Sequence, residues 1–208
     1  RELLPERLRS PRVLEALAPA FPRVPRVVAI CTDPTVIGAD FFVMERIPGI
    51  ILRRDLPVEP RFSVEDAGRL CENLVDTLVE LHSVDVELPG LLQLGRGEGY
   101  VKRQVGGWTD RYRRARTPDV GDFEEVIAWL DDHRPERDSG MCLIHNDFRF
   151  DNVVLSPESP TRIVGVLDWE MATIGDPLMD LGNSLAYWIE AGDDAVFRRL
   201  RRQPTNAP

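Results

Sequence analysis

The chain has 208 residues, of which 43% are hydrophobic and 29% are charged, and its formal net charge at pH 7 is -9. A chain of this length and hydrophobic content can bury a core of its own, which excludes a disordered tail. The acidic balance argues against binding to a nucleic-acid phosphate backbone as the main function.

The cysteines and the hydropathy of the sequence indicate the compartment in which the protein is located. The three cysteines are odd in number and form no C-x-x-C pair, so the sequence indicates neither a disulfide framework nor a zinc site. The aliphatic run at residues 27–31 is far too short to span a bilayer, and no signal peptide opens the sequence. We therefore expect a cytoplasmic protein that binds neither membrane nor nucleic acid, and its oligomeric state is left open.

The first part of the chain is expected to form a short helix and two strands. Val13, Leu14 and Leu17 form a helical stripe that ends before two prolines. In chain order there follow a buried strand at 27–30, a turn at Asp33-Pro34, a second strand at 41–44, and the segment Glu45-Arg46-Ile47-Pro48-Gly49. Taken alone, this last segment is an ordinary strand end with a Pro-Gly turn.

Three longer helices are predicted in the middle of the chain. The first covers 63–82, starts with a capping box of Ser63 and Asp66, and has the apolar stripe Val64, Ala67, Leu70, Cys71, Leu74, Val75, Leu78 and Leu81. His82, near its end, is given no role. The second covers 100–116, and the third covers 123–133, with Val126, Ile127 and Leu130 expected inward and Trp129 packed.

Two runs of arginine have an alternative reading. They are Arg111, Arg113, Arg114 and Arg116, and then Arg198, Arg199, Arg201 and Arg202. Such runs are usually solvated helix faces, which is the interpretation we prefer. The alternative is that they form an anion site for a small molecule that carries phosphate groups.

The most informative segment runs from residue 141 to residue 181. His145, Asp147 and Asn152 keep the spacing H-x-D-x-x-x-x-N of a kinase catalytic loop. Strands at 153–155 and 162–167, joined by a proline-rich turn, predict a hairpin that brings Asp168 back beside Asn152. Phosphoryl transfer requires a carboxylate that takes the proton of the acceptor hydroxyl, and oxygen ligands for magnesium. Asp147 is the candidate base, and Asn152 and Asp168 are the candidate metal ligands.

Each of these residues also has a structural explanation when it is taken alone. His145 could be a core histidine, Asp147 a turn carboxylate, and Asn152 a cap at a strand entry. Their joint occurrence favours the catalytic interpretation, whereas Asp151 is interpreted as loop surface. Asp176 is explained by capping, with proline at the first helical position, and the helix that follows has the predicted buried stripe Leu178, Leu181, Leu185 and Trp188.

The motifs HNDFRFDN, VLDWEMAT and GDPLMDLG, in this order, resemble the catalytic core of the aminoglycoside phosphotransferase and choline kinase group. This group is the small-molecule branch of the protein-kinase-like fold, and the resemblance is strongest to the branch fused to acyl-CoA dehydrogenases. It extends from about Ser10 to Trp188. It implies an α+β fold, with residues 1–47 as a remnant of the N-lobe and hinge, and residues 48–208 as a mostly helical C-lobe whose last helices are incomplete.

The resemblance also implies roles for individual residues. His145 orients the catalytic loop, and Asp180 bonds the backbone of that loop. The carbonyl of Glu45 and the amide of Ile47 are the hinge groups that pair with adenine. The implied reaction moves the γ-phosphoryl group of ATP, with Mg2+, to a hydroxyl of a small molecule, either a hydroxyacyl-CoA, an aminoglycoside or a choline-like acceptor.

Three departures from the family leave other functions open. The glycine-rich loop and the lysine strand do not precede the hinge, and Ser10 stands where family members place a glutamate. We therefore expect a fragment that begins just after the lysine strand, and its own activity is left open. The alternative function is a catalytically incomplete module that binds a nucleotide or a partner. A metal-dependent hydrolase is less favoured, because the three histidines form no zinc cluster.

Overall fold

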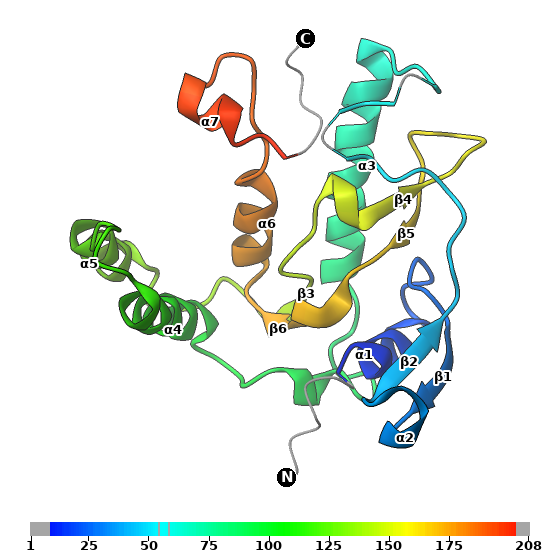
Figure 1. Ribbon diagram of the computed structural model, residues 1–208, viewed down its shortest axis with the longest axis horizontal. Coiled ribbons are helices and arrows are strands. Elements are labelled where there is room, and N and C mark those ends of the chain that lie inside the picture. Colours follow the sequence, from blue (N-terminus) through cyan, green and yellow to red (C-terminus); the bar gives the residue numbers. More distant parts are fainter. Residues whose placement is uncertain (1–8, 54, 58, 203–208) are drawn as a thin grey trace.

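A computed structural model describes residues 9–53, 55–57 and 59–202 (Figure 1). The helices are α1 (Arg9–Leu17), α2 (Pro34–Ile37), α3 (Val64–His82), α4 (Tyr100–Ala115), α5 (Glu124–His133), α6 (Pro177–Leu185) and α7 (Ala195–Arg199). The strands are β1 (Val27–Cys31), β2 (Phe41–Met44), β3 (Cys142–Ile144), β4 (Val153–Leu155), β5 (Ile163–Val166) and β6 (Thr173–Gly175). Short 3-10 turns are η2 (Leu92–Leu94), η3 (Phe150–Asn152) and η4 (Trp169–Met171). The predicted α+β class is confirmed.

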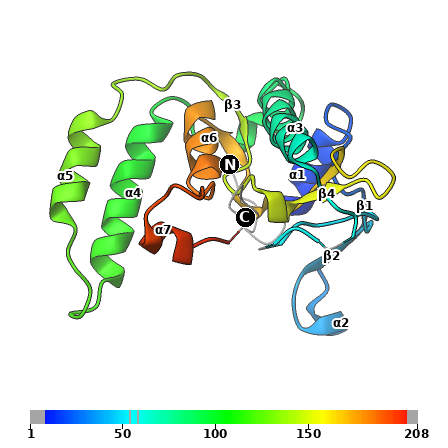
Figure 2. The ribbon, with the colours of Figure 1, turned by 90° about the horizontal axis from the view of Figure 1, so that it is seen from above.

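The helices form a row, with the strands at one end and in the middle. Figure 2 shows α5, α4, α6 and α3 side by side, and places β1, β2 and α2 at the end opposite α5. The strands pair as three antiparallel ladders, β1 with β2, β3 with β6 and β4 with β5. Among the described residues, no helix is long and apolar enough to cross a membrane.

The main core lies between α1, α3 and the β4–β5 hairpin. Its buried members include Val13, Leu14 and Leu17 of α1, Leu70, Leu74, Leu78 and Leu81 of α3, and Val153, Leu155, Ile163 and Val166 of the hairpin. The predicted capping box of α3 is confirmed, because Ser63 and Asp66 bond each other's backbone amides. The predicted burial is wrong for two members of the apolar stripe, because Val64 is 85% exposed and Val75 is 39% exposed.

The buried strand predicted at 27–30 is a strand, but it is not buried. Val28 is 55% exposed and Ile30 is 38% exposed. In the described part of the chain β1 pairs with β2 alone, so the faces of this two-stranded ladder stay largely open. The turn predicted at Asp33-Pro34 is the start of α2 instead, because Asp33 caps that helix by accepting from the Thr35 amide at 2.8 Å.

The inward face predicted for α5 is also wrong. Val126 is 52% exposed, Leu130 is 41% exposed and Trp129 is 57% exposed. Figure 2 shows the reason, since α5 is the outermost helix of the row and lies against α4 only. Trp129 stacks on His133 of its own helix, with ring centroids 4.5 Å apart.

The β4–β5 hairpin is confirmed, and the segment after β2 runs beside it. Val153 is paired with Val166, and Ile50 forms an isolated antiparallel bridge with Leu155. A Cβ atom at Gly49 would lie 2.4 Å from the Leu155 carbonyl oxygen, so this close approach requires glycine. The segment after β2 is thereby fixed along the strand that starts directly after Asn152.

The helix α6 begins as predicted but turns a different face inward. Asp176 caps it by accepting from the Leu178 amide, and proline is at the first helical position. Its buried residues are Asp180 and Ser184, whereas Leu178 is 62% exposed and Leu185 is 46% exposed. Leu181 and Trp188 of the predicted stripe are partly buried against the main core, so the stripe is correct in part. Asp180 and Ser184 are the residues buried within α6, because the catalytic loop offers this helix backbone amides rather than an apolar surface.

Candidate active site

The strand β3 leads into a loop at residues 145–149 whose first residue, His145, is fully buried. The amide of Asp147 donates to His145 Nδ1 at 3.2 Å, so His145 Nε2 carries the proton and donates to the Leu167 carbonyl at 2.9 Å. Its ring packs against that of Trp169, with centroids 4.8 Å apart. Burial lowers the pKa of His145, which keeps the ring neutral and suits it to orient the loop rather than to exchange protons.

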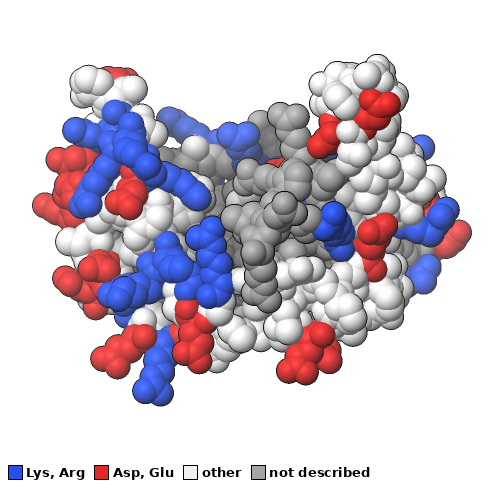
Figure 3. Space-filling model, turned by 90° about the horizontal axis from the view of Figure 1, so that it is seen from below, with Lys and Arg blue, Asp and Glu red and all other residues white. Residues whose placement is uncertain are grey.

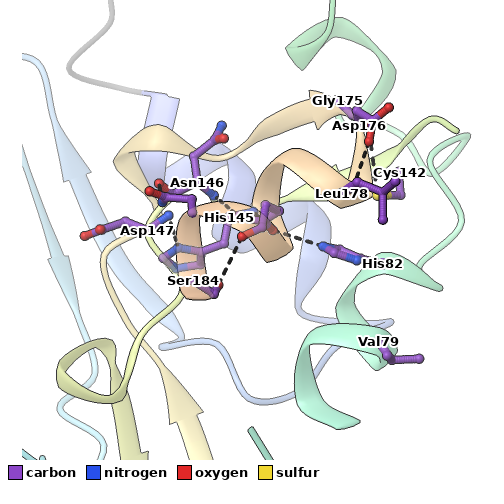
Figure 4. Close-up of polar contacts among 12 residues, drawn as sticks. Val79, His82, Cys142, His145, Asn146, Asp147, Gly175, Asp176, Leu178 and Ser184 are labelled. Atoms are coloured by element: carbon purple, nitrogen blue, oxygen red, sulfur yellow. Dashed lines mark hydrogen bonds and ion pairs between the residues drawn. The ribbon is translucent and has the colours of Figure 1, made fainter. Parts of the chain in front are cut away.

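The carboxylate of Asp180, on α6, bonds the backbone of this loop at His145 and Asn146, two residues that Figure 4 labels. Its Oδ2 accepts from the His145 amide at 2.8 Å, and its Oδ1 accepts from the Asn146 amide at 2.7 Å. Asn146 needs such support, because its backbone has a φ of 64° in the left-handed region. The contact that the resemblance implied for Asp180 is therefore present in the structure.

His82 is a residue whose position sequence reasoning missed. It lies at the end of α3, and its Nε2 is 3.0 Å from Asp180 Oδ2 (Figure 4). The only signal in the sequence was a histidine at the end of a core helix. The pairing could not be predicted, because α3 and α6 are far apart in the chain.

Asp147 and Asn152 are joined directly. Asn152 Nδ2 donates to the carboxylate oxygen Oδ2 of Asp147 and to its carbonyl, both at 2.8 Å. With its Nδ2 committed in this way, Asn152 has Oδ1 as the side-chain atom that could coordinate a metal. Burial raises the pKa of Asp147, although Arg149 and the bond from Asn152 act in the opposite direction.

The hairpin returns Asp168 to the same place. The amide of Leu167 donates to the Asn152 carbonyl at 2.8 Å, so Asp168 follows directly after a residue bonded to Asn152. Asp168 has a φ of 66°, which is uncommon for a residue other than glycine and is typical of functional sites. The negative charge of Asp168 acts to raise the pKa of both Asp147 and His145. The side chain of Asp168 is exposed, so it is accessible to a ligand.

Sequence reasoning also missed Arg149. Its Nη2 lies 3.1 Å from Asp147 Oδ2, and its Nε lies 3.1 Å from Asp151 Oδ1. The guanidinium carbon is 4.8 Å from the ring centroid of Tyr187. The interpretation of Asp151 as loop surface is wrong, because its carboxylate is turned toward Arg149 and its side chain is only 20% exposed.

Asp176 does more than cap α6. Besides the Leu178 amide, its carboxylate accepts from the amide of Ser139 at 2.5 Å and from the Ser139 hydroxyl at 2.7 Å. These bonds tie the segment before β3 to the start of α6. They make no direct contact with the catalytic loop.

The two hinge residues, Glu45 and Ile47, differ in their surroundings. The Glu45 amide donates to the Arg26 carbonyl at 2.8 Å, and the Ile47 side chain lies over Gly165 of β5. Within the described ranges, no hydrogen bond uses the Glu45 carbonyl or the Ile47 amide. Both groups are therefore open to an outside partner, and their pairing with adenine stays a prediction.

The oxygen donors of Asn152 and Asp168 suit magnesium, which prefers a few hard oxygens completed by phosphates and water. Among the described residues there is no group of three or more His, Cys, Asp or Glu side chains that could hold a metal by itself.

A cavity of about 400 Å3 lies on the α6–α7 side of Arg149. Its lining is Arg149, Ala186, Tyr187, Ile189, Phe197, Leu200 and Arg202. Most of this lining is apolar, and both charged members are arginines. The cavity is within the size range of small-molecule sites.

The sequence pattern of the phosphotransferase enzyme family matches residues 2–207. Acyl-CoA dehydrogenase family member 11 of Homo sapiens is 41% identical over 169 residues, which are 81% of this chain and 21% of that protein. The chain thus spans about a fifth of the length of this curated relative.

Solved structures show the same fold. A candidate aminoglycoside phosphotransferase from Ralstonia eutropha has a TM-score of 0.75 and 31% identity, covering 86% of this chain and 54% of that one. A phosphotransferase solved as a complex with GDP and kanamycin has a TM-score of 0.65 and 21% identity, covering 86% of this chain and 61% of that one. These likenesses confirm the protein-kinase-like fold. By the match over nearly its whole length, the chain belongs to the phosphotransferase enzyme family, in the branch that it shares with acyl-CoA dehydrogenase family members.

Proposed function

We propose that the chain moves the γ-phosphoryl group of ATP to a hydroxyl group of a small molecule, with Asp147 as the general base. The observation that carries the proposal is the connection of three residues across the loop and the hairpin. Asn152 donates to the Asp147 carboxylate, and its carbonyl is bonded to the residue before Asp168. This brings a base and two metal ligands together, as phosphoryl transfer requires.

The surroundings of Asp147 support its role as a base. Burial raises the pKa of Asp147, which makes the carboxylate a stronger proton acceptor than an exposed aspartate. The Asp180 carboxylate accepts from the amides of His145 and Asn146, the two residues before Asp147. The amide of Asp147 itself donates to His145 Nδ1. A base held in this way can meet a hydroxyl without rearranging the loop.

The nucleotide would lie between the segment after β2 and the hairpin. We assign adenine recognition to the Glu45 carbonyl and the Ile47 amide, both of which lack a protein partner among the described residues. The Oδ1 atom of Asn152 and the carboxylate of Asp168 would hold Mg2+. When bound, this ion neutralises charge on the nucleotide phosphates.

The three cysteines are free, which fits a reducing cytoplasm.

The cavity beside Arg149 is the candidate place for the acceptor. Its volume of about 400 Å3 suits a small molecule or part of one, and its two arginines disfavour a cationic acceptor. Of the three candidate acceptors, a hydroxyacyl-CoA ester therefore ranks above an aminoglycoside or a choline-like molecule. Figure 3 shows basic and acidic side chains intermingled over the α4–α5 half of the molecule, so this surface does not by itself favour one acceptor class.

The test is a phosphate-transfer assay with labelled ATP and the three acceptor classes. It is run on the 208-residue chain and on the protein with its natural flanking sequence. Asp147→Asn should lower turnover by about two to four orders of magnitude, the range for losing a general base, while ATP affinity changes little. Removal of magnesium with EDTA should abolish turnover.

The control is Asp132→Asn, which changes an exposed carboxylate of α5 and should have no effect. Near-normal turnover of Asp147→Asn would contradict the assignment of the base. If ATP binds but no acceptor is phosphorylated in either form of the protein, the alternative of a binding module without turnover is correct.

A further inference from the structure

Arg149 lines the candidate acceptor cavity and also contacts the candidate base, and no role has been assigned to this second contact so far. We propose that Arg149 is a positioning residue for phosphoryl transfer: held by Asp151 and Tyr187, it fixes the Asp147 carboxylate in the orientation that meets the acceptor hydroxyl. The inference rests on the proposed function, because it assumes that Asp147 is the base.

Three contacts hold the guanidinium from three sides. Nη2 meets Asp147 Oδ2, Nε meets Asp151 Oδ1, and the carbon atom at the centre of the group faces the Tyr187 ring. The side chains of Asp147, Arg149 and Asp151 are 23%, 21% and 20% exposed, so these pairs are partly shielded from water. Shielding strengthens an ion pair relative to one on the open surface.

The local sequence explains why Arg149 points toward the site. It lies between Phe148 and Phe150, which are 1% and 6% exposed and belong to the main core. Because the two phenylalanines are anchored in the core, the arginine between them is turned away from it. The pattern Phe-Arg-Phe therefore fixes the backbone on both sides of the side chain that contacts Asp147.

The pair of Arg149 and Asp151 limits the freedom of the guanidinium. Arg149 Nε and Asp151 Oδ1 are buried atoms 3.1 Å apart, and in the described structure neither has a hydrogen-bond partner besides this ion contact. The contact therefore serves both buried groups, and it orients the guanidinium whose Nη2 meets Asp147.

The expected effect follows from the two donors on one carboxylate oxygen. Asp147 Oδ2 accepts from Asn152 and is paired with Arg149. Without Arg149, one of the two side-chain contacts that hold this oxygen is lost, and the carboxylate can rotate about its side-chain bonds. A misplacement of about 1 Å in a reacting group costs on the order of a hundredfold in rate.

The experiment compares Arg149→Met, Arg149→Lys and Asp151→Asn by steady-state kinetics in the form of the protein that turns over acceptor. Arg149→Met should lower kcat by about 10- to 100-fold, and the KM for ATP should stay within about threefold. Arg149→Lys keeps the charge but not the two-pronged contact, and should restore part of kcat. Asp151→Asn should lower kcat less than Arg149→Met does.

The double variant and the control make the result specific. Arg149→Met combined with Asp151→Asn should be no slower than Arg149→Met alone, because Asp151 acts through Arg149. The matched control is Arg134→Met, directly after α5, which removes an arginine of similar exposure, 24%, that pairs with Asp131. It should leave kcat unchanged. If Arg149→Met fails to fold, as judged by its thermal transition, Arg149→Gln replaces it.

Two results would overturn the inference. The first is a kcat within twofold of wild type for Arg149→Met. The second is a rise in the KM for the acceptor at unchanged kcat, which would make Arg149 an acceptor-binding residue. Asp147→Asn separates the two proposals. If it keeps its turnover, the proposed base is wrong. If it loses turnover while Arg149→Met does not, only the inference about Arg149 fails.

Discussion

Replacement of Asp180 by asparagine tests how the catalytic loop is held. The carboxylate is fully buried and accepts from the amides of His145 and Asn146, and His82 also bonds its Oδ2. The introduced amide has one acceptor oxygen, so it can serve one of the two loop amides and must turn its own donors toward the other. At least one buried backbone N–H is left without a partner.

The cost can be worked out from these contacts. An unsatisfied buried donor costs about 1–3 kcal/mol, and a hydrogen bond to a charged acceptor contributes about 1.5–3 kcal/mol. We therefore expect Asp180→Asn to lower the free energy of unfolding by about 2–4 kcal/mol. For a domain of this size, each kcal/mol shifts Tm by about 2–4 °C, so Tm should fall by about 4–16 °C.

Stability alone does not distinguish the loop from the rest of the fold, so the assay needs a matched control. Asp176 is another buried carboxylate of the same region, 1% exposed, whose partners are Ser139 and the Leu178 amide rather than the catalytic loop. Asp176→Asn should lower Tm by a similar amount. Hydrogen exchange measured well below both Tm values should show faster exchange of the amides of residues 145–146 only in Asp180→Asn.

This prediction extends to catalysis. At a temperature where both variants are folded, Asp180→Asn should lower turnover and Asp176→Asn should leave it nearly unchanged. Equal protection of the 145–146 amides in the two variants would refute the idea that Asp180 holds the loop.

Two further predictions concern buried groups around the site. His82→Leu removes one of the three partners of the Asp180 carboxylate but leaves both loop amides bonded. It should lower the free energy of unfolding, measured by urea denaturation, by about 1–2 kcal/mol. Steady-state kinetics should show a smaller loss of turnover than for Asp180→Asn. An effect as large as that of Asp180→Asn would contradict this order. Burial raises the pKa of Cys142 to about 12 from an ordinary 9.0, so its thiol should resist alkylation in the folded protein at pH 8. The folded-state pKa is raised, so this contribution to stability is complete below pH 9.0 and is lost as the pH rises toward about 12. The urea midpoint of wild type should therefore fall more between pH 8 and pH 10 than that of Cys142→Ala, and equal falls would show that the thiol does not ionise in this way.

Much of the site could be read from the sequence because its geometry is local. The loop from His145 to Asn152 and the hairpin to Asp168 occupy fewer than thirty consecutive residues, and turn and strand signals fix their path. The structure brings Asp147, Asn152 and Asp168 together in the predicted order, and their chemical roles stay predictions. Helix starts with capping signals, such as Ser63 and Asp176, were also predictable from neighbouring residues.

The burial of each helix or strand face depends on elements that are distant in the sequence, so it could not be predicted in the same way. The apolar stripes of α5 and α6 and the strand β1 predicted burial, but burial depends on which element arrives on each face. The neighbour that arrives at α5 is α4, and β1 pairs with β2 and is contacted by α1, which leaves most of both elements exposed.

Except for the bonds of Asp180, which the resemblance implied, the contacts around the catalytic loop were decided by the tertiary structure alone. The sequence by itself determined the loop, the hairpin and the residue types needed for phosphoryl transfer, because these depend on spacings of a few residues. The fold decided that α3 and α6 meet, so that His82 reaches Asp180 across 98 positions of the chain. It also decided that Tyr187 covers Arg149 beside the candidate base. Hydrogen bonds and ion pairs depend on distances of about 3 Å in space, and no spacing in the sequence specifies these for residues on separate helices.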